Sequence, residues 1–435
     1  MALLTFKGGV HPPDHKELSS GVPVKEASPP SQVLIQLSQH IGAPCKCTVQ
    51  IGQEVKKGDL IGEPTAFVSA PVHASVSGKV VALMDAPNAM GKMVPAVVID
   101  NNGKEEWTQL RDNPDYMKLT PEELKEKVKD AGIVGMGGAT FPTHVKLSPP
   151  KEKPIDVAII NGAECEPYLT ADHRMMVETP SEIIEGLKII MKVLGVSKGY
   201  VGIENNKPDA IAKMKEVSSG ETNIEVVALE VKYPQGAEKM LIKAITDRDV
   251  PAGGLPMDVG VVVQNVGTAL AVFEACRYGK PLIERVVTVT GLGVKSPGNL
   301  RARVGTPVRE LIEACGGFNN SPAKVILGGP MMGFAQYTID VPVAKGTSGV
   351  LVMSEEEHST SDKYGPCIRC GSCIDVCPMG LMPSMLSILS EKGFYEETKG
   401  YNLLDCFECG TCTYVCPSKR PIVQFIRLSK SLIKR

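Results

Sequence analysis

The sequence predicts a multidomain α/β protein: a β-rich module, a doubly wound α/β domain, a small mixed sheet and a helical cysteine-rich domain, in that order. Residues 32–100 show period-2 patterning broken by turn residues, and residues 155–247 alternate buried strands with amphipathic helices. Two four-cysteine runs lie near the C-terminal end. With 435 residues, 43% of them hydrophobic, the chain has enough apolar sequence for a core in each part.

Composition excludes some classes of function. The formal net charge is −2 and 22% of residues are charged, so we expect no nucleic-acid partner. The first residues, "MALLTFKGGVHPPDHK", lack the pattern of a signal peptide. The most apolar stretch, residues 259–276, is interrupted by Gln264 and Asn265, which favours a strand, a turn and a helix over a membrane span.

The N-terminal part divides into an extended Pro- and Gly-rich arm (1–30) and a β module (31–115). Within the module, "TVQIGQEVKKGDLIGE" and "APVHASVSGKVVAL" resemble the barrel-sandwich of biotinyl and lipoyl carrier domains. The hairpin that holds the modified lysine in such carriers reads "EPTAFVS" here and contains no Lys. We therefore expect a structural or docking role for the module, not that of a swinging arm.

Residues 116–280 are predicted to form the doubly wound domain. A capping box between Thr120 and Glu123 starts a helix that ends before Gly132. Three strands follow, at "IDVAIINGAE", "KGYVGIENN" and "IEVVALEV", and each precedes a helix. This alternation is typical of a mostly parallel sheet with helices on both faces.

Two smaller units complete the chain. In residues 281–350, "RVVTVTG", "PGNLRARVGTPVRELIEACGG" and "AKVILGGPMMG" indicate a β-grasp unit with one helix on a mixed sheet. A polar linker (354–366) leads into the cysteine domain (351–435). The basic tail from Pro421 carries an apolar stripe, which favours a helix packed under that domain over one facing a membrane.

The cysteine runs, "CIRCGSCIDVCP" (367–378) and "CFECGTCTYVCP" (406–417), share one spacing. Three closely spaced thiolates suit a cubane, and in two-cluster ferredoxins the fourth cysteine ligates the other cluster. We therefore predict two [4Fe-4S] clusters, one on Cys367, Cys370, Cys373 and Cys416, and one on Cys406, Cys409, Cys412 and Cys377. Zinc is the alternative, but its four-cysteine sites usually consist of two C-x-x-C pairs separated by a longer gap.

Two loops of the α/β domain could bind a ligand. "GIVGMGGATFPTHVKL" places four glycines in seven residues, and their bare amides could approach a phosphate, with Thr140 and Pro142 suiting a helix start. The pattern is neither a Rossmann fingerprint nor a P-loop. In "IINGAECEPYLTADHR", Glu164 and Glu166 follow a strand end, where open α/β sheets bind ligands. Solvated loop acids are the alternative interpretation.

These segments resemble a known family. "GMGGATFPTHVK", "NGAECEP", "YPQGAEKML" and "VVQNVGTA" are similar to motifs of the flavin- and NADH-binding subunit of respiratory complex I. The barrel-like module, the "GGVHPP" motif and the two cysteine runs extend the resemblance over essentially the whole chain to the C subunits of the Rnf complex, a membrane-bound ferredoxin–NAD oxidoreductase.

The resemblance implies three kinds of cofactor: FMN, NAD(H) and the two clusters. It assigns the FMN phosphate to Gly135, Gly137, Gly138 and Lys146, and the rest of the flavin to Asn161, Glu164, Tyr233, Gly236, Asn265 and Thr268. Phe141 would stack on the dinucleotide, and Glu166 and Glu238 would bond it. The sequence departs from the complex I motifs at Met136, Ala163, Ala237 and Gly267, which affects the nucleotide site more than the flavin site.

The implied function is hydride exchange between NAD(H) and FMN, followed by one-electron transfer through both clusters to or from other subunits, including a ferredoxin-like B subunit. The chemistry belongs to the cofactors, so we predict no catalytic side chain. The resemblance also implies a peripheral position on the cytoplasmic side of a bacterial inner membrane, with membrane contact only through partners. The alternatives are a cluster-bearing adaptor with a degenerate flavin site, and the flavin subunit of a soluble NAD-linked hydrogenase or formate dehydrogenase.

Overall fold

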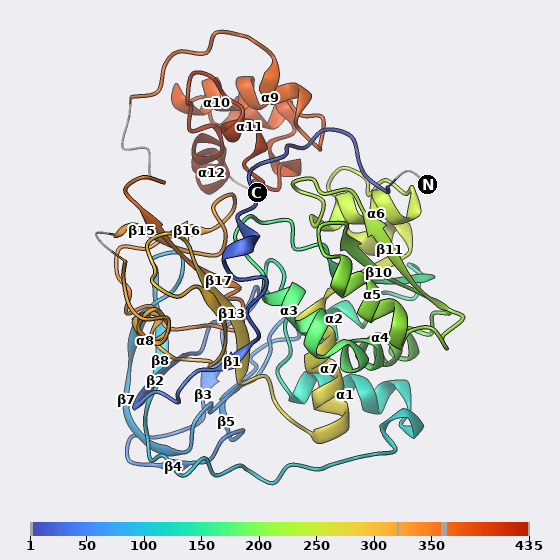
Figure 1. Ribbon diagram of the computed structural model, residues 1–435, viewed down its shortest axis with the longest axis vertical. Helices are drawn as coiled ribbons and strands as arrows, with labels where there is room; N and C mark the ends of the chain where they lie inside the picture. The colour runs from blue at the N-terminus through green and yellow to red at the C-terminus, as the bar shows by residue number, and fades with distance from the viewer. Residues whose placement is uncertain (1–2, 320–321, 358–362, 434–435) are drawn as a thin grey trace.

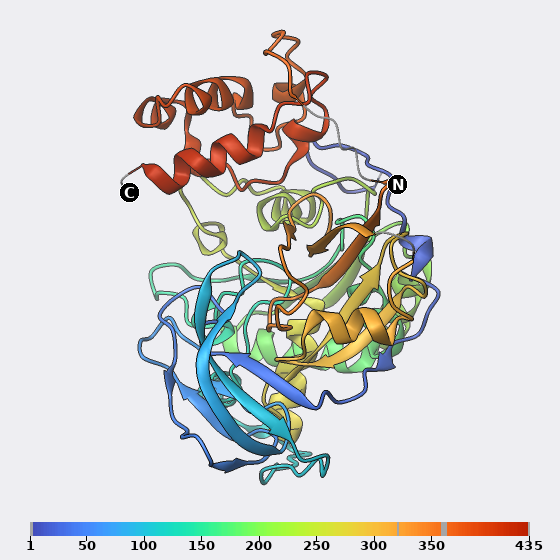
Figure 2. The same ribbon diagram turned by 90° about the vertical axis from the view of Figure 1, so that its left-hand side faces the viewer.

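The computed structural model describes residues 3–319, 322–357 and 363–433. Four sheets and a helical domain make up the molecule (Figure 1). The helical cysteine domain lies at one end of the long axis, above the α/β domain and the six-stranded sheet. The view turned by 90° shows the N-terminal β module at the opposite end (Figure 2). The mixed multidomain architecture predicted from the sequence is confirmed.

The N-terminal module has two small antiparallel sheets with a shared core. One sheet has the strand order β2-β8-β7-β4 and the other β3-β5-β6. Val33, Ile35 and Ile61 are fully buried between them. The strands are β2 (Gln32–Gln36), β3 (Lys46–Cys47), β4 (Glu54–Val55), β5 (Leu60–Glu63), β6 (Val72–His73), β7 (Gly78–Pro87) and β8 (Met93–Asn101). Two sheets facing one core agree with the barrel-sandwich prediction.

The α/β domain is built on a parallel sheet of order β11-β10-β9-β12. Ala158 and Ile160 of β9 face α4 and α7, whereas Val157 and Ile159 face α6, so both faces are covered. The strands are β9 (Val157–Gly162), β10 (Lys198–Glu204), β11 (Ile224–Leu229) and β12 (Val261–Asn265). The helices are α1 (Pro121–Asp130), α2 (Thr143–Lys146), α3 (Ala171–Glu178), α4 (Pro180–Leu194), α5 (Pro208–Val217), α6 (Glu238–Thr246) and α7 (Val266–Tyr278).

One local prediction holds in this domain, and a second holds for its strand and helix but not for the turn between them. The capping box of α1 forms, because the Thr120 side chain accepts from the Glu123 amide while the Glu123 carboxylate accepts from the Thr120 amide. The apolar stretch from Val259 becomes β12 and then α7 directly, with Asn265 as the helix N-cap. Asn265 thus stands at the strand-to-helix junction, next to the sheet edge where ligands bind in such folds.

The β-grasp unit contributes most of a mixed six-stranded sheet of order β1-β14-β13-β17-β15-β16. Strand β1 (Lys25–Glu26) comes from the N-terminal arm and pairs in parallel with β14. One helix, α8 (Val308–Ala314), packs its Leu311 and Ile312 into the core of the unit. The other strands are β13 (Glu284–Thr290), β14 (Gly298–Arg303), β15 (Pro322–Leu327), β16 (Phe334–Ala335) and β17 (Gly349–Ser354).

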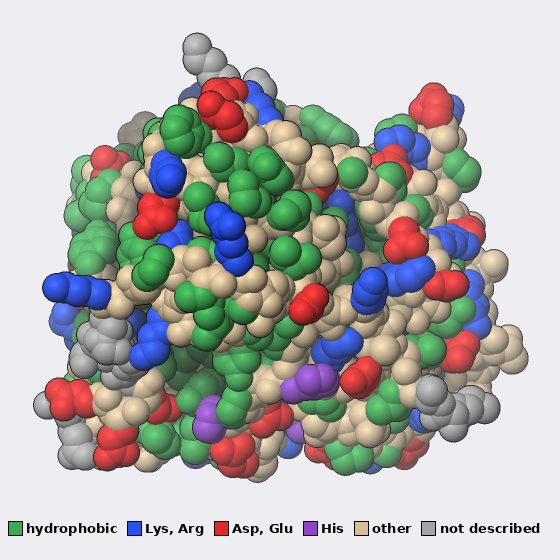
Figure 3. Space-filling model, turned by 90° about the horizontal axis from the view of Figure 1, so that it is seen from above, with side chains coloured by type: hydrophobic (Ala, Val, Ile, Leu, Met, Phe, Trp, Pro, Cys, Tyr) green, Lys and Arg blue, Asp and Glu red, His purple; other side chains and the backbone are tan. Residues whose placement is uncertain are grey.

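The cysteine domain is helical, with α9 (Ser372–Asp375), α10 (Pro383–Glu391), α11 (Thr411–Tyr414) and α12 (Ile422–Leu432). Helix α12 buries Ile422, Val423 and Ile426 beside Leu386 of α10, which confirms the prediction of a packed tail helix. Seen from above, hydrophobic side chains mix with Lys and Arg on the outer surface (Figure 3). None of the described helices is long and apolar enough to cross a membrane.

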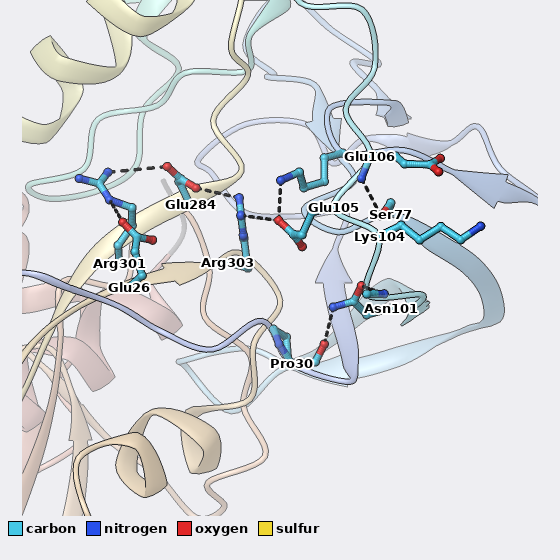
Figure 4. Close-up of polar contacts among 12 residues, drawn as sticks. Glu26, Pro30, Ser77, Asn101, Lys104, Glu105, Glu106, Glu284, Arg301 and Arg303 are labelled. Atoms are coloured by element: carbon cyan, nitrogen blue, oxygen red, sulfur yellow. Dashed lines mark hydrogen bonds and ion pairs between the residues drawn. The ribbon is translucent and has the colours of Figure 1, made fainter.

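A chain of ion pairs joins the arm, the β-grasp unit and the barrel module (Figure 4). Arg301 binds Glu26 at 3.0 Å, and Arg303 binds both Glu284 (2.8 Å) and Glu105 (2.9 Å). Lys57, only 5% exposed, completes the chain at 2.5 Å from Glu105. Because most of these groups are largely buried, each charge depends on its partner for compensation.

We expect Arg303→Met to destabilise this joint. The change removes one cationic partner from Glu284 and one from Glu105. Breaking a largely buried pair costs about 3 kcal/mol of the free energy of unfolding. Lys46→Met is the matched control, because Lys46 and Glu63 pair across a surface where they are 73% and 48% exposed; there we expect less than about 0.5 kcal/mol. Scanning calorimetry of both variants measures the difference, and equal unfolding midpoints would contradict it.

Candidate functional site: a glycine loop, an acidic strand end and two cysteine loops

The glycine loop follows α1 and closes on itself. The Gly135 amide donates to the Phe141 carbonyl at 2.9 Å, and the Met136 amide donates to the Thr268 hydroxyl at 3.0 Å. Gly137 and Gly138 are exposed at its tip. A Cβ at Gly137 would lie 2.9 Å from the Asn265 side chain, whereas at Gly138 nothing lies within 4 Å. The tip thus offers bare backbone, packed on one side and open on the other.

The helix start predicted from Thr140 and Pro142 lies at Pro142, and Thr140 has no part in it. Helix α2 begins at Thr143, with Pro142 as its N-cap residue. Thr140 adopts φ +52° and its hydroxyl donates to the neighbouring Ala139 carbonyl. It therefore lies within the loop, where its left-handed backbone turns the chain before the helix begins.

Lys146, at the end of α2, lies near the loop and is held in place. Its ammonium donates to the Glu238 carboxylate at 2.8 Å and to the Val263 carbonyl at 2.6 Å. The Lys146 side chain is 24% exposed and that of Glu238 is 40% exposed. Two residues expected to bind different ligands, the FMN phosphate and the dinucleotide, therefore bind each other here.

The end of β9 brings three further predicted residues together. The Asn161 amide donates to the Gly236 carbonyl at 2.8 Å, and the Gly236 amide donates to the Cys165 thiol at 3.2 Å. Glu164 accepts from the amides of Asp172 (2.7 Å) and His173 (3.2 Å) in the first turn of α3. The polar groups at the strand end are therefore bonded mainly to one another and to the first turn of α3.

Glu166 is bonded to the turn between β15 and β16. Its carboxylate accepts from the amides of Met331 (3.2 Å) and Met332 (2.8 Å). Burial raises the pKa of Glu166 to about 7, and these amides act against the shift. Burial likewise raises the pKa of Glu164 to about 7, while the nearby Lys16 ammonium lowers it.

The residues predicted to contact the flavin or the dinucleotide fall into two groups. Tyr233, Asn265 and Thr268 are buried and bonded within the protein: Thr268 to the glycine loop, Asn265 to Asp172, and Tyr233 to the Cys409 carbonyl. The rest have surface that is at least partly accessible, namely Gly135, Gly137, Gly138, Phe141, Lys146, Asn161, Glu164, Glu166, Gly236 and Glu238. The first group supports the loops, and the second group can touch a ligand.

Four buried cations at this site escaped the sequence-based prediction. Lys16 of the arm donates to the Leu169 carbonyl at 2.5 Å, and Lys207 donates to the Ala163 carbonyl at 2.7 Å. Arg285 donates to the Met136 carbonyl at 2.8 Å, and Lys345 to the Gly132 carbonyl at 2.6 Å. The motif "HPPDHK" draws attention to the arm, but nothing in the local pattern distinguishes these cations from surface charges.

The glycine loop and strand end fit FMN in two respects. The exposed amides of the Gly137–Gly138 tip leave space that any Cβ would reduce, as a phosphate cradle requires. Lys146 supplies a cation from the adjoining helix end. FMN would therefore be held on the phosphate side by the tip and Lys146, with Asn161 and Gly236 nearby.

The two cysteine loops adopt the same conformation. Gly371 (φ +85°) and Gly410 (φ +88°) turn the chain before α9 and α11. Amides of Leu381 and Glu408 donate to the thiols of Cys377 and Cys406, both at 3.4 Å. Such donors to sulfur help to set the reduction potential of an iron–sulfur cluster.

The neighbours of the Cys406, Cys409 and Cys412 thiols fit the exchange of the fourth ligand, because they include Cys377 of the other run. Burial raises the pKa of Cys406 to about 11, and among the thiols that raise it further are Cys409 of its own run and Cys377 of the other. Burial raises the pKa of Cys373, with Cys367 and Cys370 as thiol neighbours that add to the shift. In the described residues no three Cys, His, Asp or Glu side chains lie close enough to hold a single metal ion. The agreement of this domain with two iron–sulfur clusters therefore rests on which thiols are neighbours of one another.

Four family models match the chain, in the order of its modules. They are the RnfC barrel sandwich hybrid domain (residues 4–104), the Nuo51 FMN-binding domain (128–274), the SLBB domain (286–335) and the 4Fe-4S dicluster domain (366–419). The FMN-binding match includes both the glycine loop and the strand end, and the dicluster match includes both cysteine runs.

Relatives align with almost the whole chain. The C subunit of the proton-translocating ferredoxin:NAD(+) oxidoreductase complex of Clostridium ljungdahlii is 53% identical, covering 99% of this chain and 94% of that protein. The C subunit of the Na(+)-translocating complex of Acetobacterium woodii is 48% identical, covering 98% and 96%. The C subunit of the ion-translocating oxidoreductase complex of Pseudomonas aeruginosa is 42% identical, but this chain spans only 56% of its length.

Among solved structures, an NAD+-reducing [NiFe]-hydrogenase in its H2-reduced state shares part of the fold. The match has a TM-score of 0.51 at 18% identity and covers 74% of this chain and 64% of that one. The air-oxidised state matches with a TM-score of 0.50 at 20% identity, covering 66% and 55%. At this identity the likeness is one of fold alone.

We expect Cys377→Ala to damage the cluster built on Cys406, Cys409 and Cys412, because the Cys377 thiol neighbours those thiols. Electron paramagnetic resonance of the reduced protein would show that cluster lost or converted and the other unchanged. Cys416→Ala is the matched variant and should give the opposite pattern. Loss of only the cluster of the mutated run in each variant would contradict the ligand exchange.

Proposed function

Because this chain belongs to the family of C subunits of ion-translocating ferredoxin:NAD+ oxidoreductase complexes, we propose that it connects NAD(H) to the electron path of such a complex. The observation that carries the proposal is that a single chain joins an FMN-binding domain directly to a two-cluster domain. The protein is an oxidoreductase subunit with FMN and two [4Fe-4S] clusters as cofactors and NAD(H) as substrate. Bound FMN supplies the exchange between hydride and single-electron chemistry.

In this proposal the chain's own residues position cofactors and tune potentials. The tip at Gly137 and Gly138, with Lys146, holds the FMN phosphate. Thr268 and Asn265 act behind the loop and fix its shape. The resemblance implied that they contact the flavin itself, so in this proposal they have a supporting role instead. The eight cysteines of the two runs hold the clusters, with Cys377 and Cys416 exchanged between them.

Glu238 and Phe141 remain our proposed contacts for the dinucleotide. Both are partly accessible: Phe141 lies on the glycine loop, and Glu238 begins α6 and pairs with Lys146. For Glu166 the proposed role is weaker, because both its oxygens accept backbone amides of the β15–β16 turn. Bonding a nucleotide would require Glu166 to release one of these amides.

The partners in this proposal are the other subunits of a membrane-bound complex, and we propose that this subunit docks on its cytoplasmic side through a ferredoxin-like subunit. Exposed apolar side chains support docking at the cysteine domain, since Ile368, Phe394 and Leu404 are 64%, 49% and 55% exposed. The identity of 53% to a C subunit favours this assignment over a hydrogenase flavin subunit, for which the likeness is at 18–20% identity.

The deciding experiment is anaerobic purification, counting of flavin and iron, and NADH titration followed by absorbance. We expect Gly138→Val to reduce FMN content by about tenfold or more while iron content stays full, because the new side chain occupies the phosphate cradle without meeting other protein atoms. Gly220→Val is the matched control, since Gly220 also has nothing within 4 Å.

Two results would count against the proposal. Wild-type protein with full iron but no bound or rebindable FMN would favour the adaptor with a degenerate flavin site. Unchanged flavin content in Gly138→Val would remove the glycine tip from the site.

A further inference from the structure

The cysteine domain meets the α/β domain at a specific buried contact. The Tyr233 hydroxyl donates to the Cys409 carbonyl at 2.7 Å, and Tyr233 is only 2% exposed. Val10, Tyr233 and Cys409 form one small apolar cluster, against which Cys165 and Met331 pack. The loop after β11 thus directly touches a cysteine loop.

The N-terminal arm passes through the same contact. Val10 and Tyr233 exchange two backbone hydrogen bonds, both 2.8 Å, and the Gly9 amide donates to the Val376 carbonyl at 2.9 Å. Figure 1 shows the start of the chain running along the underside of the cysteine domain before it descends. Residues 8–10, which we call the strap, therefore bond to both domains at once.

The strap needs glycine at two consecutive positions. Gly8 and Gly9 both have φ +83°, a conformation that other residues rarely adopt. A Cβ at Gly9 would lie 2.7 Å from the Tyr233 carbonyl oxygen, and one at Gly8 would lie 3.1 Å from the Val376 oxygen. Both oxygens belong to the backbone. Neither close contact could therefore be relieved by the movement of a flexible side chain.

The strap and Tyr233 contact a cysteine of one set and the residue directly before another cysteine of that set. Val376 precedes Cys377, and Cys409 accepts from Tyr233, so both contacts belong to the set Cys377, Cys406, Cys409 and Cys412. Cys409 and Cys412 are 8% and 6% exposed; in the other set Cys373 is also 8% exposed, but Cys370 is exposed. One set therefore lies against the α/β domain through Cys409, and the other reaches the outer surface at Cys370.

We infer that the strap and Tyr233 clamp the cluster of Cys377, Cys406, Cys409 and Cys412 against the α/β domain, making it the cluster that exchanges electrons with the flavin. The inference rests on the proposed function. When NADH is oxidised to NAD+, its hydride carries two electrons to FMN. They leave singly through this inner cluster, each reducing it by one electron, then pass to the outward cluster, and the flavin proton goes to solvent. Gly8, Gly9 and Tyr233 are positioning residues in this step.

The test compares Gly9→Ala with Gly21→Ala in full-length protein loaded with FMN and both clusters. Gly21 lies in the same arm with nothing within 4 Å, so it is the matched control. Stopped-flow absorbance after NADH addition separates flavin bleaching from cluster bleaching. In Gly9→Ala we expect cluster bleaching to slow on the order of tenfold to a hundredfold while flavin bleaching is unchanged, because a small displacement between fixed groups has a large effect on rate. Gly21→Ala should match wild type.

A second readout does not depend on electron transfer. Hydrogen exchange should show faster exchange of the Gly9 and Val10 amides and of residues 404–416 in Gly9→Ala, and not in Gly21→Ala. If Gly9→Ala fails to fold, Gly8→Ala should give the same pattern, because a Cβ at Gly8 would approach the backbone of Val376 and Cys377 in the cysteine loop. Unchanged exchange in both variants would overturn the clamp.

Cys412→Ser tests the order of the clusters. It removes a ligand of the inner cluster, so NADH should reduce the outward cluster on the order of tenfold more slowly or not at all, while dithionite still reduces it. Outward-cluster reduction by NADH at the wild-type rate would overturn the assignment. If NADH fails to bleach flavin in wild-type protein, the proposed function fails, and hydrogen exchange still decides whether the strap clamps the two domains.

Discussion

The buried ammonium of Lys16 is the interaction on which the arrangement of the modules depends. It lies at the carboxyl edge of the parallel sheet, bonded to the carbonyls of Leu169 and Glu166, and burial lowers its pKa. A cation removed from water needs acceptors and opposite charges nearby, and Glu164 and Glu204 supply the charges. This anchor fixes the middle of the arm, and the segments on either side of it then reach different modules.

From that anchor the arm joins three parts of the molecule. Toward the N-terminus it passes between Tyr233 and the cysteine loops, and toward the C-terminus it adds β1 to the sheet of the β-grasp unit. Glu26 of the same strand enters the chain of ion pairs that ends at Lys57 of the barrel module. The arm, which has little regular structure of its own, therefore links the four modules and fixes their relative positions.

The site combines an open face with a rigid back. Gly137 and Gly138 present bare backbone, with the partly exposed Lys146 beside them, while Thr268 and Arg285 bond the loop from behind and Asn265 lies next to Gly137. A cofactor enzyme needs this division, because its reactive atoms must be held at fixed spacing by groups that do not themselves react. Glu164 and Glu166 keep some accessible surface but accept backbone amides, and burial raises the pKa of each to about 7.

The sequence by itself determined the features that depend on local spacing: the four-module order, the capping box at Thr120, the parallel strands and the two cysteine loops. The capping box and the cysteine loops are each encoded in a short stretch, and the strands and modules follow from local patterns repeated along the chain, so periodicity and turn chemistry suffice to predict them. Only the tertiary structure decided which side chains support the site. Tyr233 and Cys409 are 176 residues apart, and Lys16 and Leu169 are 153 apart. No local pattern marks Lys16, Lys207, Arg285 or Lys345 as buried, because the burial of a charge depends on acceptors that distant segments bring to it.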